Sequence, residues 1–211
     1  MYLLVYRYSH WNTEKIKSCD SNECGTFNVH HEHNDKEKAA RTIQEIVRRN
    51  KILLNHLKSK YVENHFRSLD PNKNNVIDVI SNEAIDDYIR ERVQQLLLNY
   101  NSDQIYEISP LNYRNLTSYT ENKRTLVLCL RKKEKNGSGE NEIHDINTIM
   151  FVVIHELSHM MNNMWGHPED YWKLFRFMLE NAVEANVYKP INYQLHPVVY
   201  CGLKISYNPL F

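Results

Sequence analysis

Residues 146–168 read INTIMFVVIHELSHMMNNMWGHP, and the other predicted elements are arranged around them. Its apolar residues recur at the spacing of a helix face, and further apolar residues fill the opposite side, so the sequence predicts a helix buried nearly all round. Into that helix the chain places His155, Glu156 and His159. Ionisable groups in a core need a partner, because an unsatisfied one costs about 1–3 kcal/mol.

The spacing of these three residues indicates what the partner is. Side chains four positions apart lie on one face of a helix, one turn along, so His155 and His159 can converge on a single ion. Glu156 then points beside that ion, where a coordinated water would lie. The pattern predicts a zinc site, and histidines that are hydrogen-bonded in the core are the alternative.

The residues after the helix predict a tight reversal. Asn162, Asn163 and Gly166 favour turn or left-handed conformations, and Pro168 suits the first position of a second helix, predicted to continue to residue 188. The reversal would bring His167 back toward the first two histidines.

We therefore predict His167 as the third zinc ligand, with Glu169, Glu180 or Glu184 as the alternative. Three protein ligands with an open fourth position are typical of a catalytic zinc, whereas a structural zinc has four, often cysteines. No cysteine lies in this stretch.

These motifs resemble a known family. HELSH followed by GHPEDYWKLF is similar to the SprT-like and WLM-type minimal zinc metalloproteases. Together with TSYTENK, LVLCLR and the later YCG, it resembles the WLM-like metallopeptidases encoded by large nucleocytoplasmic DNA viruses. The resemblance runs from about Lys36 to the C-terminus and is strongest from Thr117 to Glu180. The seven residues between His159 and His167 make a somewhat longer gap than in the shortest members.

The resemblance implies an α+β fold, a compact zincin-like domain whose HExxH helix packs against a small mixed sheet, with additional N-terminal helices. It implies a zinc-dependent metallopeptidase with His155, His159 and His167 as ligands, and a protein or peptide as substrate. Glu156 would activate a zinc-bound water as general base. The alternative is a catalytically silent, zinc-stabilised structural or virion-associated protein with the same fold. DNA as a partner rests on family analogy alone.

Length and composition set the domain organisation. The 211 residues suit one domain: an extension with a short hairpin over residues 1–34, a metallopeptidase domain over 35–188, and a tail over 189–211 packed on it. The net charge is zero, which excludes recruitment of nucleic acid or anionic membrane by a global field. No transmembrane segment is predicted, because the apolar start spans only residues 2–6, far short of the ~20 needed.

Four cysteines and no secretory signal favour a reducing, intracellular compartment, cytoplasmic or virion-associated. A hairpin over residues 16–33 would place Cys19 opposite Cys24, with His30, His31 and His33 following. These residues are the candidates for a second metal site, although their spacing matches no standard zinc motif. A solvated strand end rich in histidine is the preferred interpretation.

The remaining pattern predicts the elements around the zinc helix. Asn34 or Asp35 caps a long amphipathic helix that continues to Tyr61, and a second helix covers residues 82–100. A strand is expected at 105–108, and a hairpin pairs 117–120 with 125–130. One of these strands would present its edge to an extended peptide. The tail offers His196 and Tyr200, by residue type alone, as groups near the site.

Overall fold

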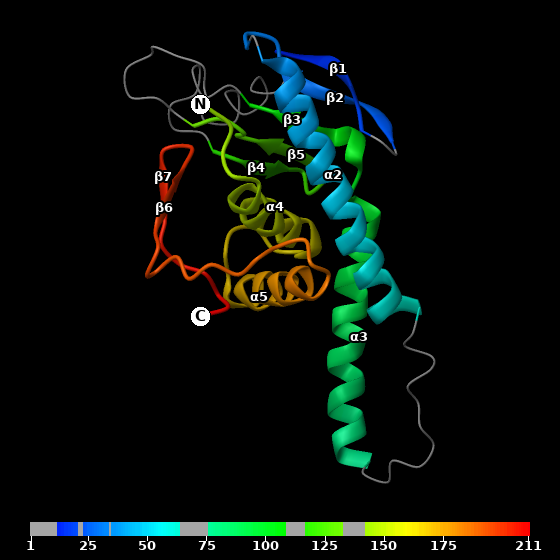
Figure 1. The fold of residues 1–211 in the computed structure, drawn as a ribbon. Helices are drawn as coiled ribbons and strands as arrows, with labels where there is room; N and C mark the ends of the chain where they lie inside the picture. The colour runs from blue at the N-terminus through cyan, green and yellow to red at the C-terminus, as the bar shows by residue number, and fades with distance from the viewer. Residues whose placement is uncertain (1–11, 21–22, 34, 64–75, 109–116, 133–141) are drawn as a thin grey trace.

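The computed structural model describes residues 12–20, 23–33, 35–63, 76–108, 117–132 and 142–211 (Figure 1). The predictions for the apolar start at residues 2–6 lie outside these ranges. The described chain forms four α-helices, a five-stranded mixed sheet and a two-stranded hairpin, which confirms the predicted α+β class.

The sheet combines the N-terminal hairpin with strands from the middle of the chain, in the order β1-β2-β3-β5-β4. Its first and last pairs are antiparallel, and the two inner pairs, β2 with β3 and β3 with β5, are parallel. The predicted N-terminal extension thus contributes two strands to the sheet that borders the site. The strands are β1 (Thr13–Cys19), β2 (Cys24–His30), β3 (Ile105–Glu107), β4 (Tyr119–Glu121) and β5 (Thr125–Leu128).

Helices cover the sheet and surround the predicted zinc helix. Helix α2 contacts β1 and β2, whereas α4 contacts α3, α5 and β4 (Figure 1). The α-helices are α2 (Lys36–Lys58), α3 (Val76–Asn99), α4 (Ile146–Met161) and α5 (Glu169–Glu184). A short π-helix follows α2 at Ser59–Glu63, and a 3-10 turn, Ser102–Gln104, precedes β3.

The tail forms a hairpin made of β6 (Val198–Tyr200) and β7 (Leu203–Ile205), and a disulfide joins its turn to Cys129 just after β5. The sequence predicted only a packed tail here, and the structure shows two paired strands. Cys201 and Gly202 take positive φ of 48° and 84° at its turn, which allows the tight reversal.

Two predicted helix boundaries were wrong by several residues. Helix α3 begins at Val76 rather than near residue 82. Helix α5 ends at Glu184 rather than 188, because Asn186 takes a left-handed φ of 56° and the amides of Val187 and Tyr188 donate to the carbonyl of Ala182. Pro168 occupies the N-cap of α5, one position before the predicted one.

The start of α2 shows how a local signal can be overridden. Asp35 is the N-cap residue, as predicted, but its side chain makes no capping hydrogen bond. It instead accepts a hydrogen bond from Arg131, which is fully buried and also donates to Glu107 at 2.7 Å. Leaving a buried guanidinium without a carboxylate partner costs more free energy than losing one capping hydrogen bond at a helix end.

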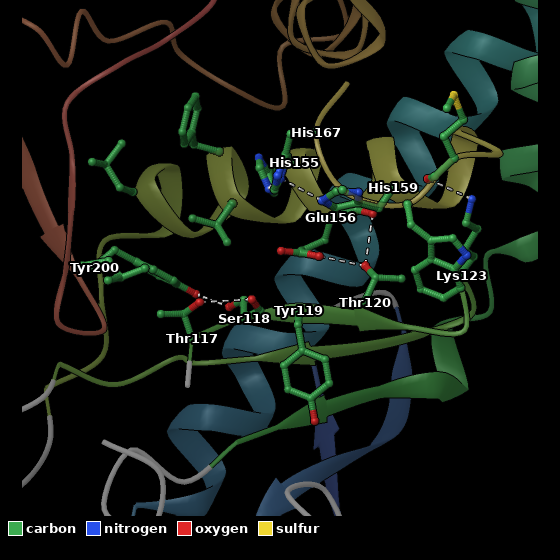
Figure 2. Close-up of a pocket in the computed structure, with 17 residues that line it drawn as sticks. Thr117, Ser118, Tyr119, Thr120, Lys123, His155, Glu156, His159, His167 and Tyr200 are labelled. Atoms are coloured by element: carbon green, nitrogen blue, oxygen red, sulfur yellow. Dashed lines mark hydrogen bonds between the residues drawn. The ribbon is translucent and has the colours of Figure 1, made fainter. Parts of the chain in front are cut away.

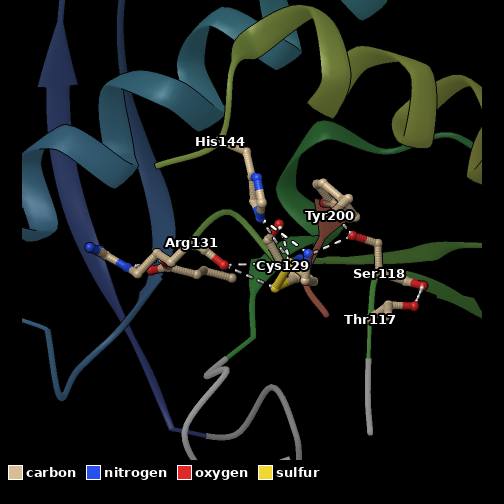
Figure 3. The surroundings of a disulfide bond; sticks show 8 residues. Thr117, Ser118, Cys129, Arg131, His144 and Tyr200 are labelled. Carbon is tan, nitrogen blue, oxygen red and sulfur yellow. Dashed lines mark hydrogen bonds and ion pairs between the residues drawn. A yellow bond between two sulfur atoms is a disulfide. The ribbon is translucent and has the colours of Figure 1, made fainter. Parts of the chain in front are cut away.

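The cysteines, which were expected to favour a reducing compartment, form two disulfides, and the predicted placement of Cys19 opposite Cys24 is confirmed. Cys19 is bonded to Cys24 across the β1–β2 hairpin, and Cys129 is bonded to Cys201, 72 residues away (Figure 3). The second pair forms because the β6–β7 hairpin folds back onto the end of β5, a contact that spacing in the sequence does not reveal.

Within the described ranges, every helix is too short or too polar to cross a lipid bilayer.

Candidate metal centre

Helix α4 carries the first two predicted ligands. Its start is fixed by Asp145, whose carboxylate accepts a hydrogen bond from the Thr148 amide at 3.0 Å, an N-cap interaction. The helix is buried on most of its surface, as predicted, while His155 and His159 are only partly buried. Both imidazoles therefore lie where the helix borders a cleft.

The reversal after α4 delivers His167. Asn162 is extended rather than left-handed, and its side-chain oxygen accepts a hydrogen bond from the Met164 amide at 3.0 Å. Gly166 takes a φ of 76°, a conformation that a side chain would strain. The chain then enters α5 with His167 facing α4 (Figure 2).

The three imidazoles converge through one nitrogen each. Nε2 of His167 lies 3.1 Å from Nε2 of His155 and 3.2 Å from Nε2 of His159. Within the described part of the chain these three residues form the group of His, Cys, Asp or Glu side chains that could hold a metal ion. The predicted ligand set thus comes together without any of the alternative glutamates.

Burial favours the neutral form of these imidazoles, which is the form that binds metal. Desolvation, with the neighbouring histidines adding to it, lowers the pKa of His155 to about 3 and that of His159 to about 4. Burial also lowers the pKa of His167. All three nitrogens therefore offer lone pairs at neutral pH.

Tyr171 forms the floor under the three rings. It is fully buried, its ring stacks on His159 with centroids 4.4 Å apart, and it meets the rings of His155 and His167 at 5.2 and 4.6 Å. Its hydroxyl donates to the carbonyl of His155 at 3.1 Å. Tyr171 lies four residues after His167, in the first turn of α5. Its contacts with the rings of His155 and His159 therefore join α5 to α4 next to the three imidazoles.

Glu156 lies beside the histidines and is almost fully buried. Its Oε2 accepts a hydrogen bond of 2.9 Å from the hydroxyl of Thr120 on β4, which also reaches the Glu156 carbonyl (Figure 2). Burial raises the pKa of Glu156 to about 7, and the bonds from Thr120 oppose that rise. A carboxyl group near pKa 7 can both take up and release a proton at neutral pH.

The histidines and Glu156 open into a cleft of about 500 Å³. It lies between α4, the loop that carries His167, strand β4 with the residues before it, and the β6–β7 hairpin. The side chains along it are mostly apolar or aromatic. They are Thr117, Ser118, Tyr119, Thr120, Lys123, Phe151, Val152, His155, Glu156, His159, Met164, Trp165, Gly166, His167, Tyr200, Leu203 and Ile205.

The other predicted candidates lie elsewhere or have different contacts. Glu169, Glu180 and Glu184 pair with Lys173, Arg176 and Lys60, respectively. His196 is exposed and does not line the cleft, whereas Tyr200 lines it and shares a 2.7 Å hydrogen bond with the Ser118 hydroxyl.

The N-terminal histidines do not assemble a second metal group in the described part of the chain. His30 and His33 are buried, which corrects the interpretation of this strand end as solvated, and only His31 is exposed. The two nearby cysteines are consumed by their disulfide.

Sequence reasoning missed three residues that shape the site: Thr120, Lys123 and Tyr171. Thr120 and Lys123 lie in the motif TSYTENK, but nothing in its spacing shows that it contacts α4. Tyr171 was assigned only to the apolar face of the second helix. Its position four residues after His167 was the available signal.

Comparison with known proteins points to viruses. The chain is 35% identical over 133 residues to an uncharacterized protein of Acanthamoeba polyphaga mimivirus, covering 58% of this chain and 64% of that protein. It is 30% identical over 91 residues to one of Invertebrate iridescent virus 6, covering 38% and 49%, and 34% identical over 73 residues to one of Invertebrate iridescent virus 3, covering 35% and 43%.

In each case the chain spans less than two thirds of the relative's length. No protein-family model matches the chain. No solved structure matches it significantly. The three sequence matches show that the chain is homologous to uncharacterized proteins of large DNA viruses.

Proposed function

We propose that this chain is a zinc-dependent metallopeptidase with a zincin-type fold. The observation that carries the proposal is the convergence of three imidazole nitrogens at 3.1 and 3.2 Å beside a buried carboxyl group, at the wall of an open cleft. Histidines that only pack in a core would have no reason to direct their ring nitrogens toward one point beside a cleft.

The donor set fits a zinc ion. Two nitrogens that each lie about 2.0–2.1 Å from a tetrahedral zinc are about 3.3–3.4 Å apart. Nε2 of His167 lies 3.1 Å from that of His155 and 3.2 Å from that of His159, and the three ligand atoms all lie within 4.8 Å of one another. His155, His159 and His167 line the cleft and would hold the ion through three neutral nitrogens, and a site with three protein ligands is typical of catalytic rather than structural zinc.

A zinc ion held by His155, His159 and His167 would polarise a peptide carbonyl and lower the pKa of a coordinated water to about 7. Glu156 would accept a proton from the attacking water and pass it to the leaving amine, a role that suits a group whose pKa is about 7. Thr120 fixes the carboxylate oxygen that would otherwise rotate away, because its hydroxyl donates to Oε2.

The peptide substrate would lie along β4. This strand is last in the sheet order, and Tyr119 and Thr120 on it line the cleft opposite α4. An extended peptide beside β4 would pass directly over Glu156 and the three histidines. This is the way in which strand addition presents a backbone to a site.

Two substitutions separate metal binding from catalysis. Purified wild-type protein should contain about one zinc per chain by mass spectrometry. His159→Ala should lose it, whereas Glu156→Gln should retain it. On a library of fluorogenic peptides, Glu156→Gln should lower kcat/KM by about 10²–10⁴-fold, since the general base is removed.

Zinc-loaded Glu156→Gln protein with full peptidase activity would contradict the role of Glu156. Well-folded wild-type protein without zinc, purified without chelators and offered zinc in solution, would contradict the metal centre itself.

A further inference from the structure

The two ends of the cleft differ in chemistry. Toward the C-terminal end of α4 the cleft is bounded by Lys123 and Trp165, with the cation 5.7 Å from the indole centroid. Toward the N-terminal end it is bounded by Phe151 and Val152 on α4 and by the β6–β7 hairpin, with Tyr200 at the far side (Figure 2).

The hairpin presents one apolar face to the cleft because side chains alternate along a strand. Tyr200 pairs with Leu203 and Val198 with Ile205, so these four side chains share a face, and Leu203, Ile205 and Tyr200 line the cleft. The pair between them, Val199 and Lys204, faces away from it.

This apolar end adjoins the reacting groups. Phe151 and Val152 lie four residues before His155 and Glu156, hence one helical turn away on the same face of α4. Of the residues that line this end, Thr117, Ser118, Phe151, Val152, Tyr200, Leu203 and Ile205, none carries a charge.

The wall is anchored in three ways. The Cys129–Cys201 disulfide joins the hairpin turn to the end of β5. The Cys201 amide donates to Nε2 of His144 at 3.2 Å, and the hydroxyls of Tyr200 and Ser118 share a 2.7 Å hydrogen bond (Figure 3). Because the hairpin is held in place before a substrate binds, little conformational entropy of the hairpin is lost on binding.

We infer that this end of the cleft is a subsite for a large apolar side chain, Leu, Met or Phe, of the peptide substrate. The inference rests on the proposed peptidase function and adds its substrate class. A charged side chain placed here would lose part of its hydration against the uncharged side chains that line this end in the described part of the chain. A small side chain would leave the apolar walls exposed to water, whereas a large one would bury them.

The test compares cleavage with binding. Wild-type protein is given a fluorogenic peptide library, and zinc-loaded Glu156→Gln is titrated by calorimetry with acetylated alanine-based hexapeptides that carry Phe, Ala, Asp or Lys at one position. We expect one subsite at which Leu, Met or Phe is preferred to Ala by about tenfold or more in kcat/KM, and the Phe peptide to bind about tenfold or more tighter than the Ala peptide.

Two variants of one hairpin locate that subsite. Leu203→Asp places a carboxylate on the cleft face and should abolish the apolar preference while improving the Lys peptide. Val199→Asp makes the same change on the outer face and should leave the preference intact. Both positions are well exposed, at 59% and 65%, so neither variant disturbs the core, which thermal melting checks.

The outcomes distinguish the two proposals. Cleavage without an apolar preference, or a preference that survives Leu203→Asp, would overturn the subsite and leave the peptidase. Apolar peptides that bind to the Glu156→Gln protein but are never cleaved by the wild type would overturn the peptidase and leave the subsite. If no peptide is bound by the Glu156→Gln protein and none is cleaved by the wild type, both proposals are overturned.

Discussion

At the scale of single residues, the proposed role of Glu156 depends on one contact between β4 and α4. The Thr120 hydroxyl lies 2.9 Å from Oε2 of Glu156, inside a region that water hardly reaches. Two opposing influences act on this carboxyl group. Burial raises its pKa, and the hydrogen bond from Thr120 lowers it toward the value of about 7.

Replacing Thr120 should therefore shift the pH dependence of peptide cleavage. Thr120→Val removes a hydrogen bond that favours the ionised carboxylate, so the pKa of Glu156 should rise further, by about one unit. Because the ionised form is the base, the acid limb of kcat/KM should move to higher pH and activity near pH 6 should fall. Thr120→Ser keeps the hydroxyl and should keep the wild-type profile. An acid limb that stays in place in the valine variant would contradict this account.

At the scale of elements, the β4–β5 turn holds the loop that carries His167. Asn122 and Lys123 both take left-handed φ, 51° and 57°, the pair of conformations that a two-residue hairpin turn requires. The turn points the Lys123 ammonium at the loop, where it donates to the carbonyls of Asn162 and, at 3.3 Å, Met164. Two elements far apart in the chain are joined next to the third ligand.

Lys123→Met should weaken zinc binding without removing a ligand. The change keeps the length of the side chain and deletes its hydrogen bonds to the loop, so His167 is held less firmly. Residues that orient ligands typically contribute about 10–100-fold to metal affinity, and we expect about tenfold here. The dissociation constant is measured by competition with a chromogenic chelator. Lys132→Met, which loses an exposed ion pair with Glu142 away from the His167 loop, is the matched control. Equal affinities in the two variants would exclude the role of Lys123.

At the scale of the whole molecule, two disulfides cross-link the fold over different lengths. The Cys129–Cys201 bond spans 72 residues and the Cys19–Cys24 bond spans 5. The entropy lost by the unfolded chain grows with loop length. Replacing the long-range pair by alanines should therefore lower the free energy of unfolding by about 4 kcal/mol, against about 2 kcal/mol for the short-range pair.

Urea unfolding of the two double-alanine variants under oxidising conditions measures this difference. The long-range variant should also lose the apolar preference of the cleft, because its hairpin wall is released. A larger loss of stability in the Cys19–Cys24 variant would contradict the ranking.

Acid should weaken the fold through buried histidines. Burial lowers the pKa of His144 and of His33 to about 4, below the value of 6.5 that each has when unfolded. Between pH 6.5 and pH 4 the unfolded chain therefore binds protons that the folded chain does not. Stability then falls as the pH falls through this window, and is fully present above it.

Urea midpoints at several pH values measure the slope. Since a change of one pKa unit corresponds to about 1.4 kcal/mol, each histidine accounts for at most about 3 kcal/mol over the window. His144→Asn should give a shallower slope than the wild type. Identical slopes in the wild type and His144→Asn would mean that His144 is protonated equally in the folded and unfolded chains.

Features that depend on neighbours along the chain could be predicted from the amino-acid sequence. The apolar period of residues 146–161 gave the buried helix, and the spacing of His155 and His159 placed both on one face. Gly166, with its left-handed φ, made the reversal that returns His167 to them. Spacing of three to eight residues suffices for such predictions, because helix geometry and turn geometry are local.

Contacts between residues that lie far apart in the sequence are seen in the tertiary structure and could not be predicted from the sequence. Thr120 reaches Glu156 across 36 positions, Arg131 reaches Glu107 across 24, and Cys129 reaches Cys201 across 72. These contacts depend on the order of strands in the sheet and on the path of the tail, which hydrophobic periodicity does not specify. The three histidines of the candidate metal centre and the facing of Cys19 and Cys24 could therefore be predicted from the sequence. The wall of the cleft, the hydrogen bond from Thr120 to Glu156 and the pairing of Cys129 with Cys201 could not.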